Sequence, residues 1–112
     1  MPLIKITLGK ISEEREQALL SELSREIAVL TNKPEKYVMV ISNSSQNIIF
    51  GGCESDSCFV ELKSIGAIEP KSMTRSISKV IEKYCSIPAD RIYINFEDVK
   101  ASHWGWNNST FG

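Results

Sequence analysis

The chain has 112 residues, of which 42% are hydrophobic and 24% are charged, and its formal net charge is −1. This length is typical of one domain, and such a chain buries enough surface to form a core without crosslinks. The balanced charge lacks the basic excess of a nucleic-acid binder, and every apolar run is far shorter than the roughly 20 residues of a membrane span. These totals exclude nucleic-acid and membrane partners and favour a globular domain.

The cysteines and the single histidine limit the redox and metal chemistry. Three cysteines are an odd number, and the spacing of Cys53 and Cys58 is not that of a redox pair. With His103 as the one histidine, the chain lacks the ligand spacing of a zinc site. Lys5 and Lys10 flank only a short apolar stretch, so no signal peptide is expected. We therefore expect reduced thiols, no metal and no cofactor, in a cytoplasmic protein.

The first residues, MPLIKI, predict a strand that begins at once. Ile4, Ile6 and Leu8 alternate along one face. Pro2 has no backbone N–H, so it suits the first position of a strand and not its interior. Pro2 therefore has two interpretations. It simply starts the strand and favours N-terminal processing, or removal of Met1 leaves it with a free secondary amine that acts as a base.

The residues after Ser12 predict an amphipathic helix and then a second strand. Ser12 suits an N-cap, and the acids that follow it suit the positive end of the helix dipole. Spacings of four, four and three residues place one apolar stripe along the helix, at Leu19, Leu23, Ile27 and Leu30. Pro34 stops the helix, and residues 37–42, YVMVIS, predict a strand.

The second half of the chain repeats this pattern at an offset of 54 residues. When the sequence is shifted by this offset, Pro34 aligns with Pro88, and apolar residues of the second strand align with Ile92 and Ile94. The apolar positions of the first strand and helix fall on apolar residues, namely Cys58, Val60, Leu62, Met73, Ile77, Ile81 and Tyr84. We interpret this as one domain, residues 1–112, with an internal duplication of two β-α-β units at roughly 2–42 and 56–96, each with a right-handed crossover.

Two such units predict an α+β fold, a four-stranded sheet with both helices on one face. Residues 47–50 predict a small extra strand before a turn at Gly51 and Gly52. The tail HWGWNNSTFG is too rich in Gly, Asn and Ser for a helix, but its aromatic residues should pack against the body. The strands CFVELKSI and RIYINF would expose apolar side chains on the face without helices. We expect a second copy of the chain to cover that face.

Six segments, in order and spread over the whole chain, resemble the macrophage migration inhibitory factor (MIF) family of the tautomerase superfamily. The first is the MP dipeptide that places a proline after the initiator. The others are KPEKYVMV (33–40), FGG (50–52), SIGAI (64–68), PADRIYINFED (88–98) and GWNNSTFG (105–112). Each segment is weak evidence alone, but six in order identify the chain as similar to this family.

The resemblance implies a homotrimer whose three sheets form a central barrel. It also implies keto–enol tautomerase activity toward phenylpyruvate-like acids and dopachrome-like compounds, at a site between subunits. Pro2 would be the general base, aided by Lys33 and the backbone of Ile65 from its own chain, with Tyr93 and Asn95 from the neighbour. The remaining residues expected to contact the aromatic keto acid are Ser64, Leu3, Trp106 and Phe111.

These residue types suit proton transfer between carbon and oxygen, although each also has a structural interpretation. A terminal amine has an ordinary pKa of about 7.7–8.0, and apolar surroundings or the charge of Lys33 would lower the pKa of Pro2. Lys33 suits a substrate carboxylate or, alternatively, the helix dipole. Tyr93 and Asn95 are ordinary strand residues or interface residues, and Asn95 suits hydrogen bonding because Asn is rare in strands. If Met1 is retained, the Pro2 nitrogen is an amide and not a base.

Several positions depart from the family pattern. Residues 57–60, SCFV, stand where some members carry a C-x-x-C motif, so thiol oxidoreductase activity is not expected. Ser12 and Ser45 stand where the animal cytokine uses Arg and Asp to imitate a chemokine-receptor motif. Lys63 and Trp104 change the pocket rim and with it the substrate preference. The alternative function is a cytokine-like protein that binds a receptor, with a vestigial site and secretion by a non-classical route.

Overall fold

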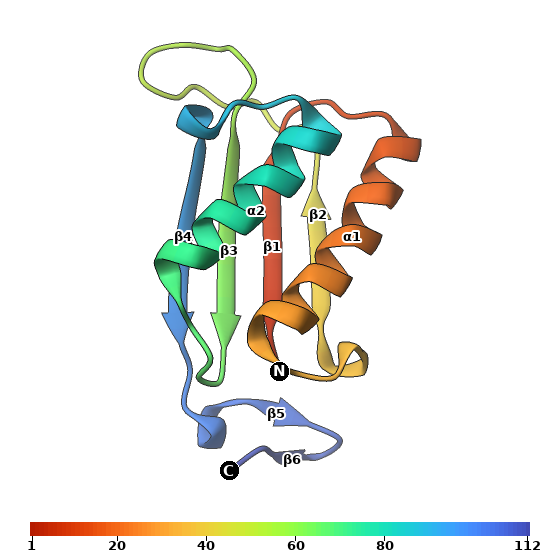
Figure 1. The fold of residues 1–112 in the computed structure, drawn as a ribbon, viewed down its shortest axis with the longest axis vertical. Helices are drawn as coiled ribbons and strands as arrows, with labels where there is room; N and C mark the ends of the chain where they lie inside the picture. The colour runs from red at the N-terminus through yellow and green to blue at the C-terminus, as the bar shows by residue number, and fades with distance from the viewer.

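The central feature of the fold is one mixed four-stranded sheet, in the order β2-β1-β3-β4 (Figure 1). The computed structural model describes all 112 residues. β1 pairs in parallel with β2 and antiparallel with β3, and β3 pairs in parallel with β4. The strands are β1 (Leu3–Leu8), β2 (Met39–Asn43), β3 (Cys58–Ser64) and β4 (Ile92–Asp98). The N-terminus therefore enters the sheet at one of its two inner strands.

Two helices complete the β-α-β units, and local capping sets their ends. In α1 (Glu13–Thr31), the Ser12 hydroxyl accepts a hydrogen bond from the Arg15 N–H at 3.2 Å, as predicted. Asn32 ends α1 in the left-handed conformation (φ 54°). In α2 (Pro70–Cys85), Pro70 occupies the first turn, where its missing N–H leaves no bond unmade.

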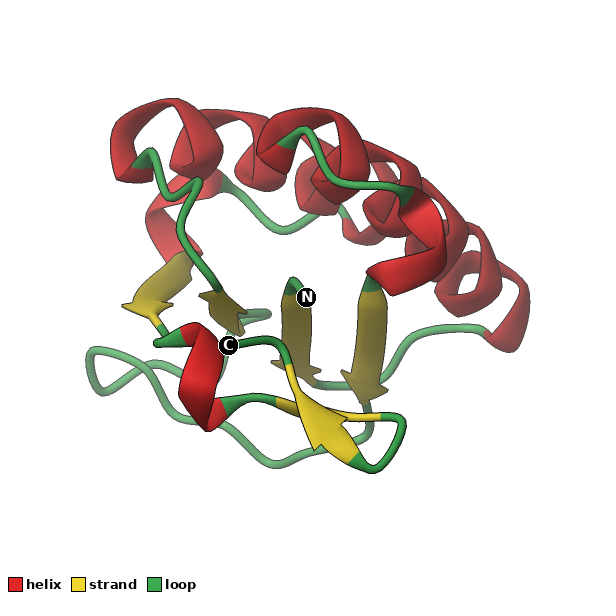
Figure 2. Ribbon diagram, turned by 90° about the horizontal axis from the view of Figure 1, so that it is seen from below, coloured by secondary structure: helices red, strands yellow, loops and turns green.

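Both helices cover the same face of the sheet, as Figure 2 shows from one end. The buried stripe of α1 is Leu19, Leu23 and Ile27, and that of α2 includes Met73 and Ile77. These side chains pack on the inward-facing residues of the strands, including Ile4, Ile6, Val60 and Leu62, all 0% exposed. The predicted sheet with two helices on one face is confirmed. An origin of the two units by duplication stays a prediction.

The opposite face of the sheet carries exposed apolar side chains, as predicted. Tyr93 is 64% exposed, Met39 59% and Phe59 41%, and Ile41 on β2 is also exposed. Alternation along β3 and β4 places these residues opposite the core-facing ones. No segment of the same chain covers them with a helix (Figure 2).

Two strand predictions were wrong in position. Residues 47–50 form no strand, since only Phe50 makes an isolated bridge, to Cys53. The loop is held instead by Arg91, whose guanidinium donates to the carbonyl oxygens of Phe50 (2.8 Å), Ser55 (2.9 Å) and Cys53 (3.1 Å). Those carbonyl groups are thus satisfied without a strand partner.

Tyr37 was predicted to start the second strand, but it ends a 3-10 turn at Glu35–Tyr37, and β2 begins at Met39. Pro34 opens this turn, and the Tyr37 N–H donates to the Pro34 carbonyl at 3.0 Å. The turn changes the direction in which the Tyr37 ring points relative to a strand. That change places the ring in the cavity described below.

The C-terminal tail forms a 3-10 turn (Ala101–His103) and a short hairpin of β5 (Gly105–Trp106) and β6 (Ser109–Thr110). Figure 1 shows this hairpin beyond the end of the sheet where β1 begins and β4 ends. As predicted, the tail is not an α-helix and its aromatic residues pack against the body. Neither α1 nor α2 combines the length and the apolar character that a transmembrane helix needs.

Candidate active site

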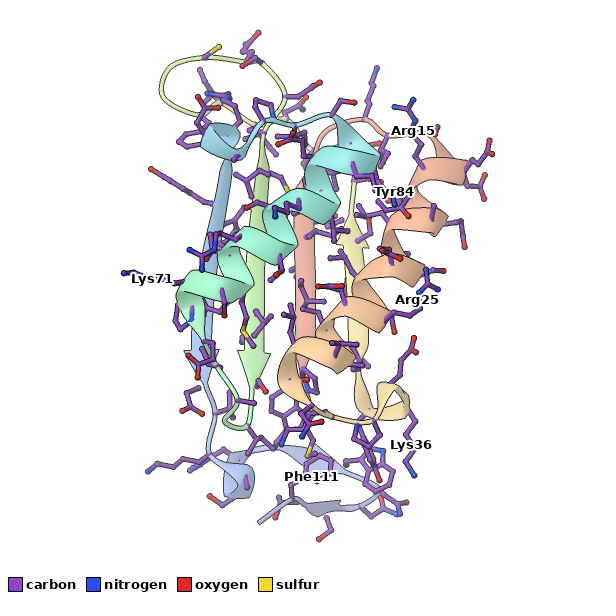
Figure 3. The ribbon with its side chains drawn as sticks, viewed as in Figure 1. Arg15, Arg25, Lys36, Lys71, Tyr84 and Phe111 are labelled. Carbon is purple, nitrogen blue, oxygen red and sulfur yellow. The ribbon has the colours of Figure 1, made fainter.

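A cavity of about 860 Å³ opens between the tail hairpin and the end of the sheet where β1 begins. Its walls come from segments that are distant in the sequence. They are residues 1–3, 36–39, 97–100 and 103–106, together with Lys63 and Phe111. Of the nine predicted site residues, Pro2, Leu3, Trp106 and Phe111 line this cavity. Figure 3 labels Lys36 and Phe111 at this end of the molecule.

One wall of the cavity is a cluster of three aromatic rings. Trp106 and Phe111 stack with centroids 5.7 Å apart and an interplanar angle of 7°. The Tyr37 ring meets both edge-on, at 5.6 Å from Trp106 and 6.2 Å from Phe111. Such pairs add stabilisation beyond simple burial, so the cluster fixes the tail onto the body. The same wall offers a flat apolar surface to an aromatic ligand.

Pro2 lies directly before β1, and its side chain is fully buried. The Pro2 carbonyl accepts a hydrogen bond from the Met39 N–H at 3.0 Å, which ties the start of the chain to β2. The terminal amine of Met1 donates to the Tyr37 carbonyl at 2.6 Å. Burial, and secondarily the charge of Lys33, lower the pKa of this amine from its ordinary value. The surroundings of the chain terminus therefore disfavour the charged form of the amine.

Lys33 follows the cap of α1 and does not line the cavity itself. Its backbone N–H donates to the Ala28 carbonyl at 3.1 Å, as part of the helix C-terminal motif. Its charge nevertheless acts on the Met1 amine, so the two groups are electrostatic neighbours. Lys33 is thus close enough to influence the chain terminus, although it is not part of the cavity wall.

Ser64 and Ile65 lie at the end of β3, beside the cavity and not in its wall. The Ser64 side chain is 0% exposed, its hydroxyl has no hydrogen-bond partner, and its carbonyl accepts from the Val99 N–H at 2.8 Å. The following Gly66 N–H donates to Asp98 Oδ1 at 3.0 Å. This bond fixes the turn after β3 against the end of β4.

Tyr93 and Asn95 are not brought to Pro2 within one chain. Tyr93 is near the start of β4, at the opposite end of the sheet, and its ring lies 4.5 Å from that of Phe50. Asn95 is exposed on the open face, beside Glu61 in the register. A single chain therefore gathers Pro2, Leu3, Lys33, Trp106 and Phe111 and leaves these two residues apart from them.

Several residues in the cavity wall were missed by the sequence reasoning. They include Tyr37, Met39, Lys100 and His103. The parallel register of β1 with β2, Leu3 opposite Met39, places residues 36–39 beside the N-terminus. Two strands of a β-α-β unit begin at the same edge of a sheet, so this neighbourhood was available from the sequence. The direction of the Tyr37 ring could not be inferred from the sequence. No group of three His, Cys, Asp or Glu side chains is arranged to hold a metal ion.

Comparison with known proteins decides the family. The profile described as macrophage migration inhibitory factor (MIF) matches residues 1–112, the whole chain. The chain belongs to the macrophage migration inhibitory factor family.

Relatives in the MIF family match along their full length. A macrophage migration inhibitory factor homolog of Brugia malayi is 36% identical over 115 residues, covering all of both chains. The macrophage migration inhibitory factor of Xenopus laevis is 34% identical over 114 residues, covering 99% of both. The crystal structure of a homologue from Prochlorococcus marinus superposes with a TM-score of 0.92 at 44% identity, covering 98% of this chain and 99% of that one. The predicted tautomerase fold of the MIF family is confirmed.

Charged side chains of both signs line the cavity of this MIF-family chain. Lys63 Nζ and Glu97 Oε2 are 3.5 Å apart, and both side chains are about half exposed. Asp98 accepts the Gly66 N–H. Lys36 and Lys100 line the same cavity and form no ion pair. The cavity therefore combines an aromatic wall with lysines free to meet an anion, which suits an aromatic acid.

Proposed function

We propose that the chain is a keto–enol tautomerase that acts on phenylpyruvate-like or dopachrome-like compounds, with Pro2 as general base once Met1 is removed. The observation that carries this proposal is the position of Pro2, buried at the start of β1 in the cavity wall, next to a Met1 amine whose pKa is lowered by its surroundings. Membership of the MIF family supports the same class of isomerase chemistry.

The proposed step moves one proton and one electron pair. The neutral Pro2 nitrogen takes a proton from the carbon next to the substrate carbonyl, and the C–H electron pair forms the new C=C bond. The C=O π pair moves onto oxygen, which gives an enolate. The proton is then returned to that oxygen to give the enol, and Pro2 is neutral again. No oxidant or cofactor is consumed.

The surrounding residues support this step in distinct ways. In the chain that carries Met1, burial and then the charge of Lys33 lower the pKa of the Met1 amine, and we expect the same influences on the Pro2 amine. Lys33 is also a cation for the substrate carboxylate or the enolate oxygen. The backbone of Ile65, beside Ser64, is the proposed hydrogen-bonding partner of the acid group. Leu3, Trp106 and Phe111 provide the apolar wall for the substrate ring.

We further propose that the active unit is a homotrimer in which a neighbour supplies Tyr93 and Asn95. Both residues lie on the open sheet face and neither lines the cavity of its own chain. That face also exposes Met39, Ile41 and Phe59, and an apolar face of this kind normally has a protein partner. A symmetric assembly brings the open face of one chain toward the cavity of the next.

A receptor-binding, cytokine-like role is the second candidate. The names of the Xenopus relatives as macrophage migration inhibitory factors support it. Against it, Ser12 and Ser45 replace the charged residues of the chemokine-receptor mimic, and the Ser12 hydroxyl is engaged as the cap of α1. In either role the proposed location is the cytoplasm, or outside the cell after non-classical secretion.

The decisive experiment begins with intact-mass measurement, which shows whether the chain starts at Pro2. Protein starting at Pro2 is expected to tautomerise phenylpyruvate, and Pro2→Gly is expected to lower kcat/KM by about 10²–10⁴. Pro88→Gly, at a 3-10 turn away from the cavity, is the matched control and should keep the rate. Protein that retains Met1 should be inactive because its Pro2 nitrogen is an amide. An unchanged rate in Pro2→Gly would exclude Pro2 as the base.

A further inference from the structure

Lys63 occupies a position next to the start of the chain that the proposed proton transfer does not use. On the open face of the sheet, Lys63 is directly opposite Leu3 of β1 on one side and Glu97 of β4 on the other. Neighbouring strands are about 4.8 Å apart, so Lys63 lies one strand away from the residue that follows Pro2. Its side chain is 47% exposed and lines the cavity.

The acids near Lys63 are engaged, and a second lysine is free. Glu97 pairs with Lys63 at 3.5 Å, which is a long contact between two exposed groups and therefore weak. The Asp98 carboxylate accepts the Gly66 N–H. Lys100, two residues beyond Asp98, lines the same cavity and forms no ion pair. The chain as a whole has a net charge of −1, so this local excess of lysine is not a consequence of composition.

The cavity also has room for more than a simple arylpyruvate. Its volume of about 860 Å³ is near the upper end of the roughly 300–1,000 Å³ typical of sites for drug-sized ligands. With the keto acid held near Pro2 and Lys33, and its ring against Trp106, a ring substituent has space to extend toward Lys63 and Lys100. Trp104 lines the cavity as well.

We propose that Lys63 and Lys100 form a second anion subsite, which makes aromatic keto acids with an additional carboxylate on the ring the preferred substrate class. This inference rests on the proposed tautomerase function. The added carboxylate replaces the weak partner Glu97 on Lys63 and gives Lys100 a partner. When no second carboxylate is bound, Glu97 is the partner of Lys63. A ligand carboxylate has to displace Glu97 and therefore binds less tightly than it would without it.

The kinetic test compares kcat/KM for 4-carboxyphenylpyruvate with kcat/KM for phenylpyruvate. The wild-type protein is expected to prefer the dicarboxylate. Lys63→Gln should lower this preference about 5- to 30-fold, and Lys100→Gln should lower it too, because each removes one charge-assisted contact. Glu97→Gln should raise the preference by removing the competitor. Lys71→Gln, on the exposed start of α2 (Figure 3), is the matched control and should not change it.

Two kinetic results would overturn the subsite. If Lys63→Gln lowers both rates equally, Lys63 serves the shared keto acid and not a second carboxylate. If the preference is the same in Lys63→Gln, Glu97→Gln and wild type, no second subsite exists.

A binding measurement separates this inference from the proposed reaction. The fluorescence of Trp104 and Trp106, both in the cavity wall, reports binding of 4-carboxyphenylacetate and of phenylacetate without turnover. Tighter binding of the dicarboxylate, lost in Lys63→Gln, supports the subsite even if Pro2→Gly shows that Pro2 is not a base. Equal binding of the two acids contradicts the subsite even if the protein is an active tautomerase.

Discussion

The terminal amine of Met1 and the carbonyl of Tyr37 are joined by a 2.6 Å hydrogen bond at the edge of the cavity. This bond fixes the start of the chain against the turn that precedes β2. The amine is also partly buried there, and burial, with a smaller contribution from the charge of Lys33, lowers its pKa. The position of the terminus, one residue before the proposed base, is thus set by backbone contacts.

The first prediction concerns Lys33 and pH. In protein that starts at Pro2, the base is active when neutral, so kcat/KM should rise with pH through the pKa of the amine. Lys33→Gln removes a cation that lowers this pKa, so the rise should move to higher pH. Lys79→Gln, an exposed lysine on α2, is the control and should leave the profile in place. A shift to lower pH, or none, would contradict the role of Lys33.

The second prediction concerns assembly through the open face. Phe59→Asp places a charge on the exposed apolar face of β3, and sedimentation velocity is expected to show loss of the trimer. Val29→Asp is the matched control because Val29 is a 76% exposed apolar residue on α1, away from the sheet face. A wild-type protein that sediments as a monomer, or a Phe59→Asp protein that stays trimeric, would refute the proposed assembly.

The third prediction concerns Arg91 and the loop before β3. Arg91→Ala removes the donors to the carbonyls of Phe50, Cys53 and Ser55, and it should speed proteolysis between residues 50 and 56. The free energy of unfolding should fall by about 1 kcal/mol, because the lost hydrogen bonds go to carbonyls that are mostly exposed to water. Arg25→Ala, at an exposed pair with Glu22, should leave both measurements nearly unchanged. Unaltered digestion of Arg91→Ala would show that other contacts hold the loop.

The fourth prediction concerns the thiols. Burial raises the pKa of Cys58 to about 12 and that of Cys85 to about 11, whereas hydrogen bonding with Ser55 lowers the pKa of Cys53, which is exposed. Iodoacetamide near neutral pH should therefore modify one thiol quickly, and Cys53→Ser should abolish that phase. Cys58 and Cys85 should react only on unfolding. If two thiols per chain react rapidly in the native protein, burial does not protect both Cys58 and Cys85.

The fold could be predicted from the sequence because its signals are local. Alternation at Ile4, Ile6 and Leu8 and the stripe through Leu19 and Leu23 each identify an element and its buried face. The conformation of the loop before β3 could not be predicted, because its carbonyl groups accept hydrogen bonds from Arg91, which is more than 30 residues away in the sequence. An apolar run such as residues 47–50 favours a strand only where a sheet edge is free to pair with it.

The site was predictable only in part, for the same reason. Pro2, Trp106 and Phe111 line one pocket, but Tyr37, at its aromatic wall, ends a 3-10 turn where the sequence pattern predicts a strand. Either a 3-10 turn or a strand can follow Pro34, and only the tertiary contacts of the Tyr37 ring decide between them. Sites that one chain leaves incomplete are harder still, as Tyr93 and Asn95 illustrate.

The bond from the Met39 N–H to the Pro2 carbonyl has a consequence for the order of events during biosynthesis. An aminopeptidase must draw the first residues of its substrate into its own cleft, and this bond, with the amine bound at Tyr37, holds them in the folded chain. We therefore expect an aminopeptidase to remove Met1 more readily from the nascent chain than from the folded protein. A molecule that folded before this step would hold the Met1–Pro2 peptide bond in place, and its Pro2 nitrogen would stay an amide.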